Sequence, residues 1–293
     1  MIEIKDLTKG YEKNKDVLKN VSLQIGDSCV FGLVGINGAG KSTLLRLIAG
    51  VLRAEAGYVY VDGENVYENE RKKRELFFLP DDPFYTSNVT ARGLAEMYAS
   101  FYDFNEKIFS DYLQKFSLNE KKPICNFSKG MKRQVFASLA LAIQPKYLLL
   151  DEAFDGLDPL ARLVFKRGLV QLVEEKGATV IISSHSLREL EDVCDGYAIL
   201  DGGAITCAGE LVGDLSRLHK FQAAFEGEIS REDFDFECLT FSKNGKVVQI
   251  IVRGDGKEIE RKIREKTPLF VEEIAVDFEE LFIGEVQSRG YLQ

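Results

Sequence analysis

The sequence of 293 residues lacks several features that define whole classes of proteins. Its net charge is −9, from 38 basic and 47 acidic side chains, so it lacks the basic excess with which general nucleic-acid binders neutralise phosphates. No apolar run approaches the roughly 18 residues of a membrane span. The start of the chain lacks the basic residues and long apolar stretch of a secretory signal. We therefore expect a soluble, cytosolic chain with no nucleic-acid partner.

Cysteine and histidine are also scarce. The five cysteines are far apart and form no CxxC pair, and the two histidines are His185 and His219. An odd number of separated cysteines favours free, mostly buried thiols, and a histidine-based zinc site is not expected. Disulfide scaffolds and most metalloenzymes are thereby excluded, while the length suits roughly two domains with substantial cores.

The first chemical signal is the octet GINGAGKS at residues 35–42. It lies between an apolar stretch at residues 29–34, which predicts a buried strand, and residues 41–49, whose apolar positions fall on one helical face. This is the GxxxxGK[ST] phosphate loop in its strand–loop–helix context. We expect Lys41 to reach the β- and γ-phosphates and Ser42 to bind Mg²⁺. The predicted nucleotide-binding residues of this stretch are Gly35, Asn37, Gly38, Ala39, Gly40, Lys41, Ser42 and Thr43.

The second signal is an apolar strand, residues 147–150, that ends in Asp151 and Glu152. The carboxyl ends of neighbouring parallel strands meet at one edge of a sheet, which brings these carboxylates to the phosphate site. Asp151 is predicted to hold Mg²⁺ and Glu152 to act as general base. A strand that ends in two carboxylates is, on its own, often just solvated, and a phosphate loop alone does not choose among kinases, GTPases and transport ATPases.

The third signal is FSKGM at residues 127–131, followed by an apolar, alanine-rich helix predicted over residues 135–143. Together with the two earlier motifs it resembles the ATP-binding subunit of an ABC transporter, whose LSGGQ signature opens a helix. The resemblance implies that Ser128 and Gly130 contact the ATP bound by the other subunit. The alternative for Ser128 is a plain helix N-cap. Lys129 and Met131 depart from the signature.

Two later stretches extend the resemblance. The sequence AFDGLDP at residues 153–159, with its GLDP core, resembles the D-loop of the family, which implies a place for Asp158 at the nucleotide interface. A predicted strand over residues 179–183 leads to His185, which matches the switch histidine. His185 is thereby expected to donate toward the γ-phosphate and to position water with Glu152. His219 has no such context.

Two residues nearer the start of the chain complete the predicted site. Tyr11 falls where the family stacks an aromatic ring on adenine, and its alternative is an exposed turn tyrosine. Asp81 stands where the Q-loop of the family normally has a glutamine. An ionised carboxylate can ligate Mg²⁺ but cannot donate a hydrogen bond. We therefore expect Asp81 to keep the metal contact and to lose donation toward the γ-phosphate.

The order of the motifs implies an α/β fold, a RecA-like P-loop NTPase core with an antiparallel β-subdomain and a helical subdomain over about residues 89–143. The ATP-binding domain is expected over residues 1–212. A small C-terminal α+β accessory domain is expected over residues 213–293, and it resembles the tails of ABC-2-type exporter ATPases. In that tail the Asn-Gly pair at residues 244–245 predicts a hairpin whose turn is residues 243–246.

The resemblance implies an ATPase, with ATP and Mg²⁺, that dimerises around two ATP molecules and drives a separate transmembrane permease, most like an exporter. Its partner subunit is a second copy or another ATP-binding chain, and its place is the cytoplasmic face of the cell membrane. Exposed aromatic residues that could receive the permease are Phe84, Tyr85, Tyr98 and Tyr102, and ordinary core packing is their alternative. A soluble ABC-type ATPase acting on ribosomes or DNA is the alternative, and a small-molecule kinase is a third reading. The transported molecule is not predicted.

Overall fold

The computed structural model describes residues 1–12 and 15–288, and its largest sheet lies in the first of two compact units, Met1–Ala208. The six strands lie in the order β10-β9-β3-β8-β7-β6, and the neighbours from β9 to β6 are parallel. The strands β3, β7 and β8 are buried along their whole length, as apolar strands covered on both faces are. The strand bounds are β3 (Val30–Val34), β6 (Leu76–Leu79), β7 (Tyr147–Asp151), β8 (Thr179–Ser184), β9 (Gly196–Asp201) and β10 (Ala204–Glu210).

A second, antiparallel sheet in this unit is the predicted β-subdomain, with strands in the order β2-β1-β4-β5. Its apolar face shares one core with helix α1 (Lys41–Ile48) and the central sheet. Ile4 of β1, Leu45 of α1 and Leu149 of β7 belong to this core and are almost fully buried. The strand bounds are β1 (Ile2–Glu12), β2 (Lys15–Ile25), β4 (Ala56–Val61) and β5 (Glu64–Asn65).

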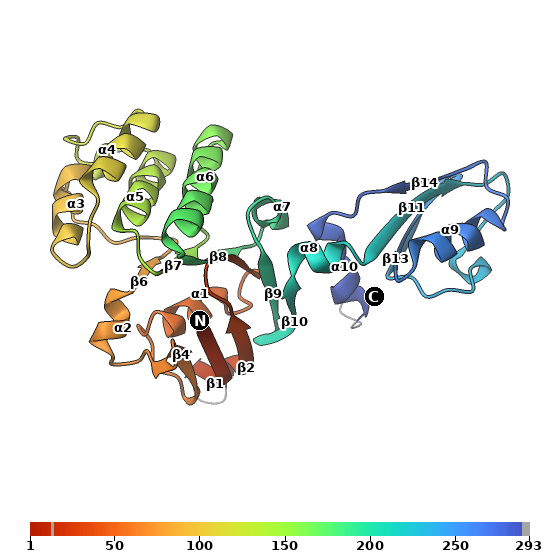
Figure 1. Ribbon diagram of the computed structural model, residues 1–293, viewed down its shortest axis with the longest axis horizontal. Coiled ribbons are helices and arrows are strands. Elements are labelled where there is room, and N and C mark those ends of the chain that lie inside the picture. The colour runs from red at the N-terminus through yellow and green to blue at the C-terminus, as the bar shows by residue number, and fades with distance from the viewer. Residues whose placement is uncertain (13–14, 289–293) are drawn as a thin grey trace. The chain divides into compact units, whose positions relative to one another are not determined.

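Helices α3, α4 and α5 form the predicted helical subdomain. Both α3 and α4 pack on α5, which also packs on α6, and these four helices gather on one side of the unit (Figure 1). Helix α5 begins directly after Ser128, so the signature is part of its first turn rather than a loop before it. The bounds are α2 (Glu70–Arg74), α3 (Ala91–Ala99), α4 (Glu106–Lys115), α5 (Lys129–Ile143), α6 (Pro159–Lys176) and α7 (Leu187–Glu191), with a short 3₁₀ turn at Ile124–Asn126.

The second unit, Gly209–Gln293, has an antiparallel sheet in the order β12-β13-β11-β14. Helix α9 packs on this sheet through Ile263, which joins Phe221 and Ile250 in the core of the unit. The bounds are α8 (Leu211–Leu215), β11 (Leu218–Ala224), β12 (Thr240–Asn244), β13 (Val247–Arg253), α9 (Gly256–Arg264), β14 (Phe270–Ile274) and α10 (Phe278–Ser288), with a 3₁₀ turn at Arg231–Asp233.

Two expected boundaries differ from the structure. The division between the units falls between Ala208 and Gly209, before the expected boundary at residue 212, because helix α8 packs against α10 and belongs to the second unit. The predicted hairpin turn is also shorter than residues 243–246. Asn244 pairs with Val247, and Gly245 takes a φ of +62°, so only two residues make the turn.

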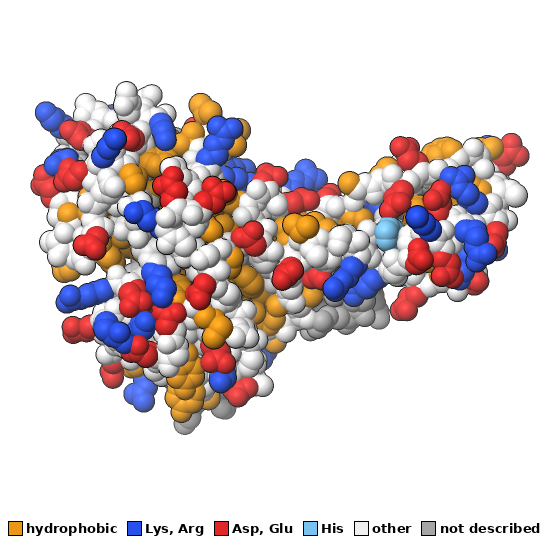
Figure 2. All heavy atoms as spheres, viewed as in Figure 1, with side chains coloured by type: hydrophobic (Ala, Val, Ile, Leu, Met, Phe, Trp, Pro, Cys, Tyr) orange, Lys and Arg blue, Asp and Glu red, His pale blue; other side chains and the backbone are white. Residues whose placement is uncertain are grey.

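Acidic and basic side chains are interspersed over the face of each unit seen in Figure 2. Among the helices of residues 1–12 and 15–288, none has the length and apolar character needed to cross a bilayer.

Candidate nucleotide-binding and hydrolysis site

The phosphate loop joins the end of β3 to the start of α1, and its glycines are needed where the chain turns. Gly38 and Gly40 have φ angles of +84° and +108°, which other residues rarely adopt. A Cβ on Gly40 would lie 2.7 Å from Leu18, and one on Gly35 would lie 2.3 Å from the carbonyl oxygen of Leu200. No described side chain caps the start of α1. The N–H groups of its first turn therefore suit an anion, which the helix dipole also favours.

Lys41 is buried and is held by the loop it follows. Its Nζ donates to the carbonyl oxygen of Gly35 at 2.7 Å and lies 3.2 Å from Oε1 of Glu152. Only 6% of its side chain is exposed, so the ammonium faces the cavity and not bulk water. A buried ammonium whose partner is a carboxylate is ready to exchange that carboxylate for a phosphate oxygen.

Ser42 and Asp151, two of the residues predicted to hold Mg²⁺, lie side by side. The hydroxyl of Ser42 donates to Oδ1 of Asp151 at 3.0 Å, and the hydroxyl of Ser183 donates to the same oxygen at 2.7 Å. Asp151 is 1% exposed. A hydroxyl and a carboxylate are hard oxygen ligands of the kind Mg²⁺ prefers, and few ligands from the protein suffice because Mg²⁺ keeps several waters. The donor set therefore fits the ion.

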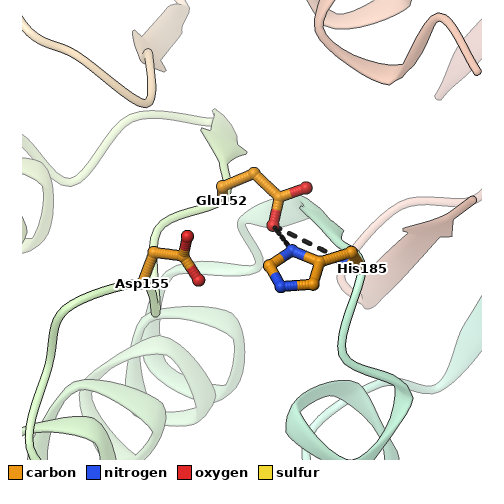
Figure 3. Close-up of side chains that lie close together, drawn as sticks. All are labelled: Glu152, Asp155 and His185. Carbon is orange, nitrogen blue, oxygen red and sulfur yellow. Dashed lines mark hydrogen bonds and ion pairs between the residues drawn. The ribbon is translucent and has the colours of Figure 1, made fainter. Parts of the chain in front are cut away.

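Glu152 and His185 meet above the ends of β7 and β8 (Figure 3). Oε2 of Glu152 lies 2.9 Å from Nδ1 of His185 and accepts the backbone N–H of His185 at 3.3 Å. The backbone N–H of Glu152 donates to the carbonyl oxygen of Ser183, which anchors the glutamate to β8. The carboxylate of Glu152 thus lies between the ammonium of Lys41 and the imidazole of His185, at the edge of the sheet predicted from the sequence.

The pKa of His185 is raised above its ordinary value. The hydrogen bond that His185 donates to Glu152 is the main cause of the rise. Burial and the charge of Lys41 oppose it, and the negative charges of Glu152 and Asp155 add to it. A raised pKa enlarges the protonated fraction near neutral pH, in which both ring nitrogens donate. His185 is therefore suited to donate toward an anion that enters the cavity.

Asp155 was not predicted, although it is part of this cluster. Its carboxylate, that of Glu152 and a ring nitrogen of His185 lie within 4.8 Å of one another. These are donor types that could hold a cation. However, the ammonium of Lys41 already lies 3.2 Å from Glu152 and would repel a second positive charge. The cluster is therefore better described as a hydrogen-bonded charge network than as a metal centre.

Asp81 reaches the site from the loop after β6 and carries an ion pair that the sequence did not reveal. Its Oδ1 accepts a hydrogen bond of 2.6 Å from Nη2 of Arg133, which is buried on α5. Asp81 also lines the cavity beside the phosphate loop. Because a carboxylate has two oxygens, the ion pair is compatible with the metal contact predicted for Asp81, which stays a prediction.

Tyr11 lies near the phosphate loop, with more than half of its residue surface exposed. Its hydroxyl is 3.2 Å from the hydroxyl of Thr43 in the first turn of α1, and the ammonium of Lys9 lies 5.8 Å from the centre of its ring. An exposed ring beside the loop is what the adenine-stacking prediction requires, but the ring also fits the alternative of a surface tyrosine. The stacking role stays a prediction.

Ser128, Gly130 and Asp158 each have a structural role within the chain. The hydroxyl of Ser128 caps α5 by accepting from Met131, and Asp158 caps α6 by accepting from Ala161. Gly130 lies against the D-loop, where a Cβ would be 2.6 Å from the carbonyl oxygen of residue 156. None of the three is among the described residues that line the cavity at the phosphate loop. Their contact with a nucleotide therefore requires a second chain and stays a prediction.

The cavity beside the phosphate loop has a volume of about 450 Å³. All of its lining residues except Val17 and Asp155 were predicted from the sequence. The lining comprises Val17, Asn37, Gly38, Ala39, Gly40, Lys41, Ser42, Thr43, Asp81, Glu152, Asp155 and His185.

Sequence reasoning missed two charged residues of the site, Asp155 and Arg133, as well as Val17 in the cavity lining. No local signal marked Arg133, because it lies beside Lys132 and Gln134 in the polar start of α5, where a solvent-exposed guanidinium would be expected. For Asp155 the only signal was a carboxylate three residues after the predicted base. That spacing alone does not show which way the side chain lies.

Known proteins match this chain over most of its length. A family model described as "ABC transporter" matches residues 18–155. The ABC transporter ATP-binding protein YtrB of Bacillus subtilis is 29% identical over 99% of each chain. The lantibiotic transport ATP-binding protein SrtF of Streptococcus pyogenes is 30% identical, over 77% of this chain and 99% of SrtF. A solved ATP-binding subunit of an ABC transporter is 29% identical, with a TM-score of 0.67 over 74% of this chain and 92% of that chain.

The relatives and the site point to the same chemistry. A phosphate loop with a buried lysine, a glutamate beside a histidine, and a parallel sheet that gathers them form the nucleotide site of a P-loop ATPase. The family model covers the stretch from before the phosphate loop to just beyond Glu152. The chain therefore belongs to the ATP-binding proteins of ABC transporters, the subunits in which ATP is bound and hydrolysed.

Proposed function

We propose that this chain works as a dimer that closes around two ATP molecules and drives transport by a separate transmembrane permease. The observation that carries the proposal is the position of Glu152, whose carboxylate lies 3.2 Å from Lys41 and 2.9 Å from His185 in the cavity of the phosphate loop. These two positive or protonatable groups are the ones a γ-phosphate would need. A phosphate that enters the cavity would compete with Glu152 for Lys41 and His185 and would free the carboxylate.

In this mechanism Lys41 and the loop N–H groups bind the phosphates, and His185 donates to the terminal phosphate. Glu152, freed from Lys41, accepts a proton from the attacking water, a contribution of about 10²–10⁴ in rate for a general base. Ser42 and Asp151, with Asp81 as a further oxygen ligand, would hold Mg²⁺, which neutralises phosphate charge when bound. Ser128, Gly130 and Asp158 would complete the site of the partner chain.

The permease would dock on the first unit at a groove of about 470 Å³ between α2 and the end of α3. The rings of Tyr98, Phe101 and Tyr102 line it together with the basic residues Lys73 and Arg74. Phe101 is 70% exposed, a large apolar surface that a partner helix would cover.

Of the four aromatic residues predicted to be exposed for docking, Phe84 is exposed but does not line this groove. The prediction of exposure was wrong for Tyr85, Tyr98 and Tyr102, which are half-buried because their rings pack on Phe136 or Phe77.

Export is the proposed direction. The expectation rests on the resemblance to ABC-2-type exporter ATPases and on relatives such as SrtF, whose name records lantibiotic transport. The location that follows is the cytoplasmic face of the membrane, where the chain would be held by its permease. The transported compound would contact the permease and not this chain.

Complementation between two inactive variants tests the dimer. Lys41→Met removes the phosphate ligand of one half-site, and Ser128→Arg blocks the signature of the other. If each site combines Lys41 of one chain with Ser128 of its partner, a mixture of the two variants contains dimers with one intact site and regains hydrolysis that neither variant has alone. A mixture as inactive as its components would refute the shared site.

Purification from detergent-solubilised membranes tests the transport role. The expected result is a stoichiometric integral membrane protein that accompanies the tagged chain. A Phe101→Asp variant should lose this partner, whereas Tyr58→Asp, an exposed aromatic residue on β4, should keep it. Recovery of ribosomes or DNA in place of a membrane protein would overturn the proposal in favour of a soluble ABC-type ATPase.

A further inference from the structure

Arg133 is a buried residue that connects two loops of the hydrolysis site. Its guanidinium, 3% exposed, donates to four acceptors. Nη1 bonds to the carbonyl of Pro80 at 3.3 Å and Nη2 to the carboxylate of Asp81 at 2.6 Å. Nη2 also bonds to the carbonyl of Glu152 at 3.1 Å, and Nε to that of Asp155 at 3.4 Å. A planar fork with five N–H donors suits such a task, whereas an ammonium cannot span these positions.

The N–H and the carbonyl oxygen of Glu152 are both hydrogen-bonded, and Arg133 supplies the second of these contacts. The φ of +47° at Glu152 lies in the left-handed region, which a residue with a side chain enters at a cost in free energy. Its N–H donates to Ser183 of β8, and its carbonyl accepts from Arg133 of α5. The direction of the glutamate side chain depends on this backbone conformation, so both contacts bear on where the carboxylate lies.

The helix that carries Arg133 is the one that begins at the signature. Gly130 lies against the D-loop so closely that a Cβ would be 2.6 Å from the carbonyl of residue 156. Arg133 is three residues further along the same helix, and it contacts the D-loop again at Asp155. The signature and the turn that carries Glu152 are therefore joined at two places, once by packing and once by hydrogen bonds.

We propose that Arg133 is a positioning residue that fixes Glu152 and Asp81 to the signature helix, so that the nucleotide of the partner site sets the geometry of the base in this chain's own site. The inference rests on the proposed dimer, in which the signature of each chain faces the other chain's nucleotide. It assigns Arg133 no contact with ATP. Its effect passes through the backbone of Glu152 and the carboxylate of Asp81.

The test compares Arg133→Gln with a matched variant on the same helix, Lys132→Gln, whose ammonium lies over the ring of Tyr85 and takes no part in the four hydrogen bonds of Arg133. Steady-state hydrolysis and ATP-driven dimerisation are measured on the full chain with ATP and Mg²⁺. Arg133→Gln should lower kcat by about 10- to 100-fold, because a small misplacement of a catalytic group has effects of this size. KM should change by less than about threefold, since the phosphate contacts are intact. The variant should accumulate as an ATP-bound dimer, and Lys132→Gln should behave as wild type.

Arg133→Lys keeps the buried positive charge and guards against a variant that fails to fold. It should also lose kcat, by less than Arg133→Gln, because one ammonium cannot reach both loops. A folded Arg133→Lys with wild-type kcat would overturn the inference, as would equal losses of kcat, nucleotide binding and dimerisation in both variants. If the wild-type chain neither dimerises with ATP nor hydrolyses it, the proposed function itself fails, and that result is distinct from normal hydrolysis in the Arg133 variants.

Discussion

The two ends of strand β7 carry charge networks that differ in how their charges are paired. At the start of β7, the hydroxyl of Tyr147 donates to Asp62, which also accepts from Lys146 at 2.8 Å and from Lys72 at 3.1 Å. At the other end, the carboxylate of Glu152 pairs with Lys41 and His185, which line an open cavity. Each network pairs one buried lysine, Lys72 or Lys41, with a carboxylate that is partly exposed. The first is closed by the protein itself, whereas the second uses partners that a substrate would also bind.

The pKa values reflect the same contrast. Burial alone would raise the pKa of Asp62, but hydrogen bonds from Lys146, Tyr147, the amino group of Met1 and Lys72 outweigh burial and hold the pKa far below its ordinary value of 3.8. Such a shift means that the folded state gains free energy from the ionised carboxylate. The difference teaches that a buried lysine paired with a carboxylate can serve stability at one end of a strand and exchange at the other.

The largest expected effect is on turnover. Glu152→Gln should lower hydrolysis by about 10²–10⁴-fold, the contribution of a general base, and trap a nucleotide-bound dimer. Asp62→Asn, which also replaces one carboxylate by an amide, should keep kcat per folded molecule within about twofold, because it touches nothing in the cavity. Single-turnover hydrolysis and size-exclusion chromatography with ATP measure both. Full turnover in Glu152→Gln would remove it from the role of base.

The second expected effect is on stability, where Asp62→Asn should be more damaging than Glu152→Gln. Asp62→Asn should lower the free energy of unfolding by about 1–3 kcal/mol, because it leaves Lys72 and Tyr147 with weaker or missing partners. Glu152→Gln should lower it less, since Glu152 pairs with two side chains, Lys41 and His185, whereas Asp62 accepts hydrogen bonds from four groups. Urea unfolding followed by circular dichroism at pH 7 gives the comparison. Equal losses in the two variants would mean that both networks serve stability alike.

A third, smaller effect concerns how the difference in stability between wild type and Asp62→Asn depends on pH. Because the pKa of Asp62 is depressed in the folded state, its stabilisation is complete above its ordinary pKa of 3.8 and is lost as the pH falls through the folded-state value. The gap in Tm between wild type and Asp62→Asn should therefore be constant from pH 7 to about 5 and narrow below about pH 4. A gap that widens in acid would contradict the assignment.

The smallest effect is a shift in the pH profile of hydrolysis. The pKa of His185 is raised mainly by its hydrogen bond with Glu152 and in part by the charge of Asp155. The protonated ring is therefore lost only as the pH rises through this raised value, and Asp155→Asn should move the alkaline limb of kcat to lower pH. The control is Asp111→Asn on α4, an exposed carboxylate of the helical subdomain, which should leave the profile unchanged. An unaltered pH profile in Asp155→Asn would show that the charge of Asp155 does not affect the titration of His185 in the reaction.

Local motifs account for most of the site that could be predicted. A few consecutive residues suffice to predict the phosphate loop and each of the two strands that lead to Asp151 and His185. Parallel pairing of β7 with β8 then brings the ends of these strands together. The pairing of Asp81 with Arg133 and that of Asp62 with Tyr147 join residues far apart in the chain. They depend on how loops and helices pack in three dimensions, which periodicity and composition do not encode.

The unit boundary and the hairpin show the same limit on a smaller scale. The Asn-Gly signal located the turn between β12 and β13 but not its length, because the length depends on whether Asn244 pairs across the ladder. Helix α8 lies just after the end of the core in sequence, and its packing on α10 decides to which unit it belongs. Both outcomes depend on contacts beyond the local sequence.

The close approach of Gly130 to the D-loop has a consequence for how such sequences are compared. A methyl group at residue 130 would collide with the carbonyl of residue 156 in a single chain, with no nucleotide and no partner present. Natural selection for folding alone would therefore retain glycine here, even in a descendant that had stopped hydrolysing ATP. A glycine at this place in a distant homologue is a record of shared ancestry and architecture, and activity has to be inferred from Lys41, Glu152 and His185.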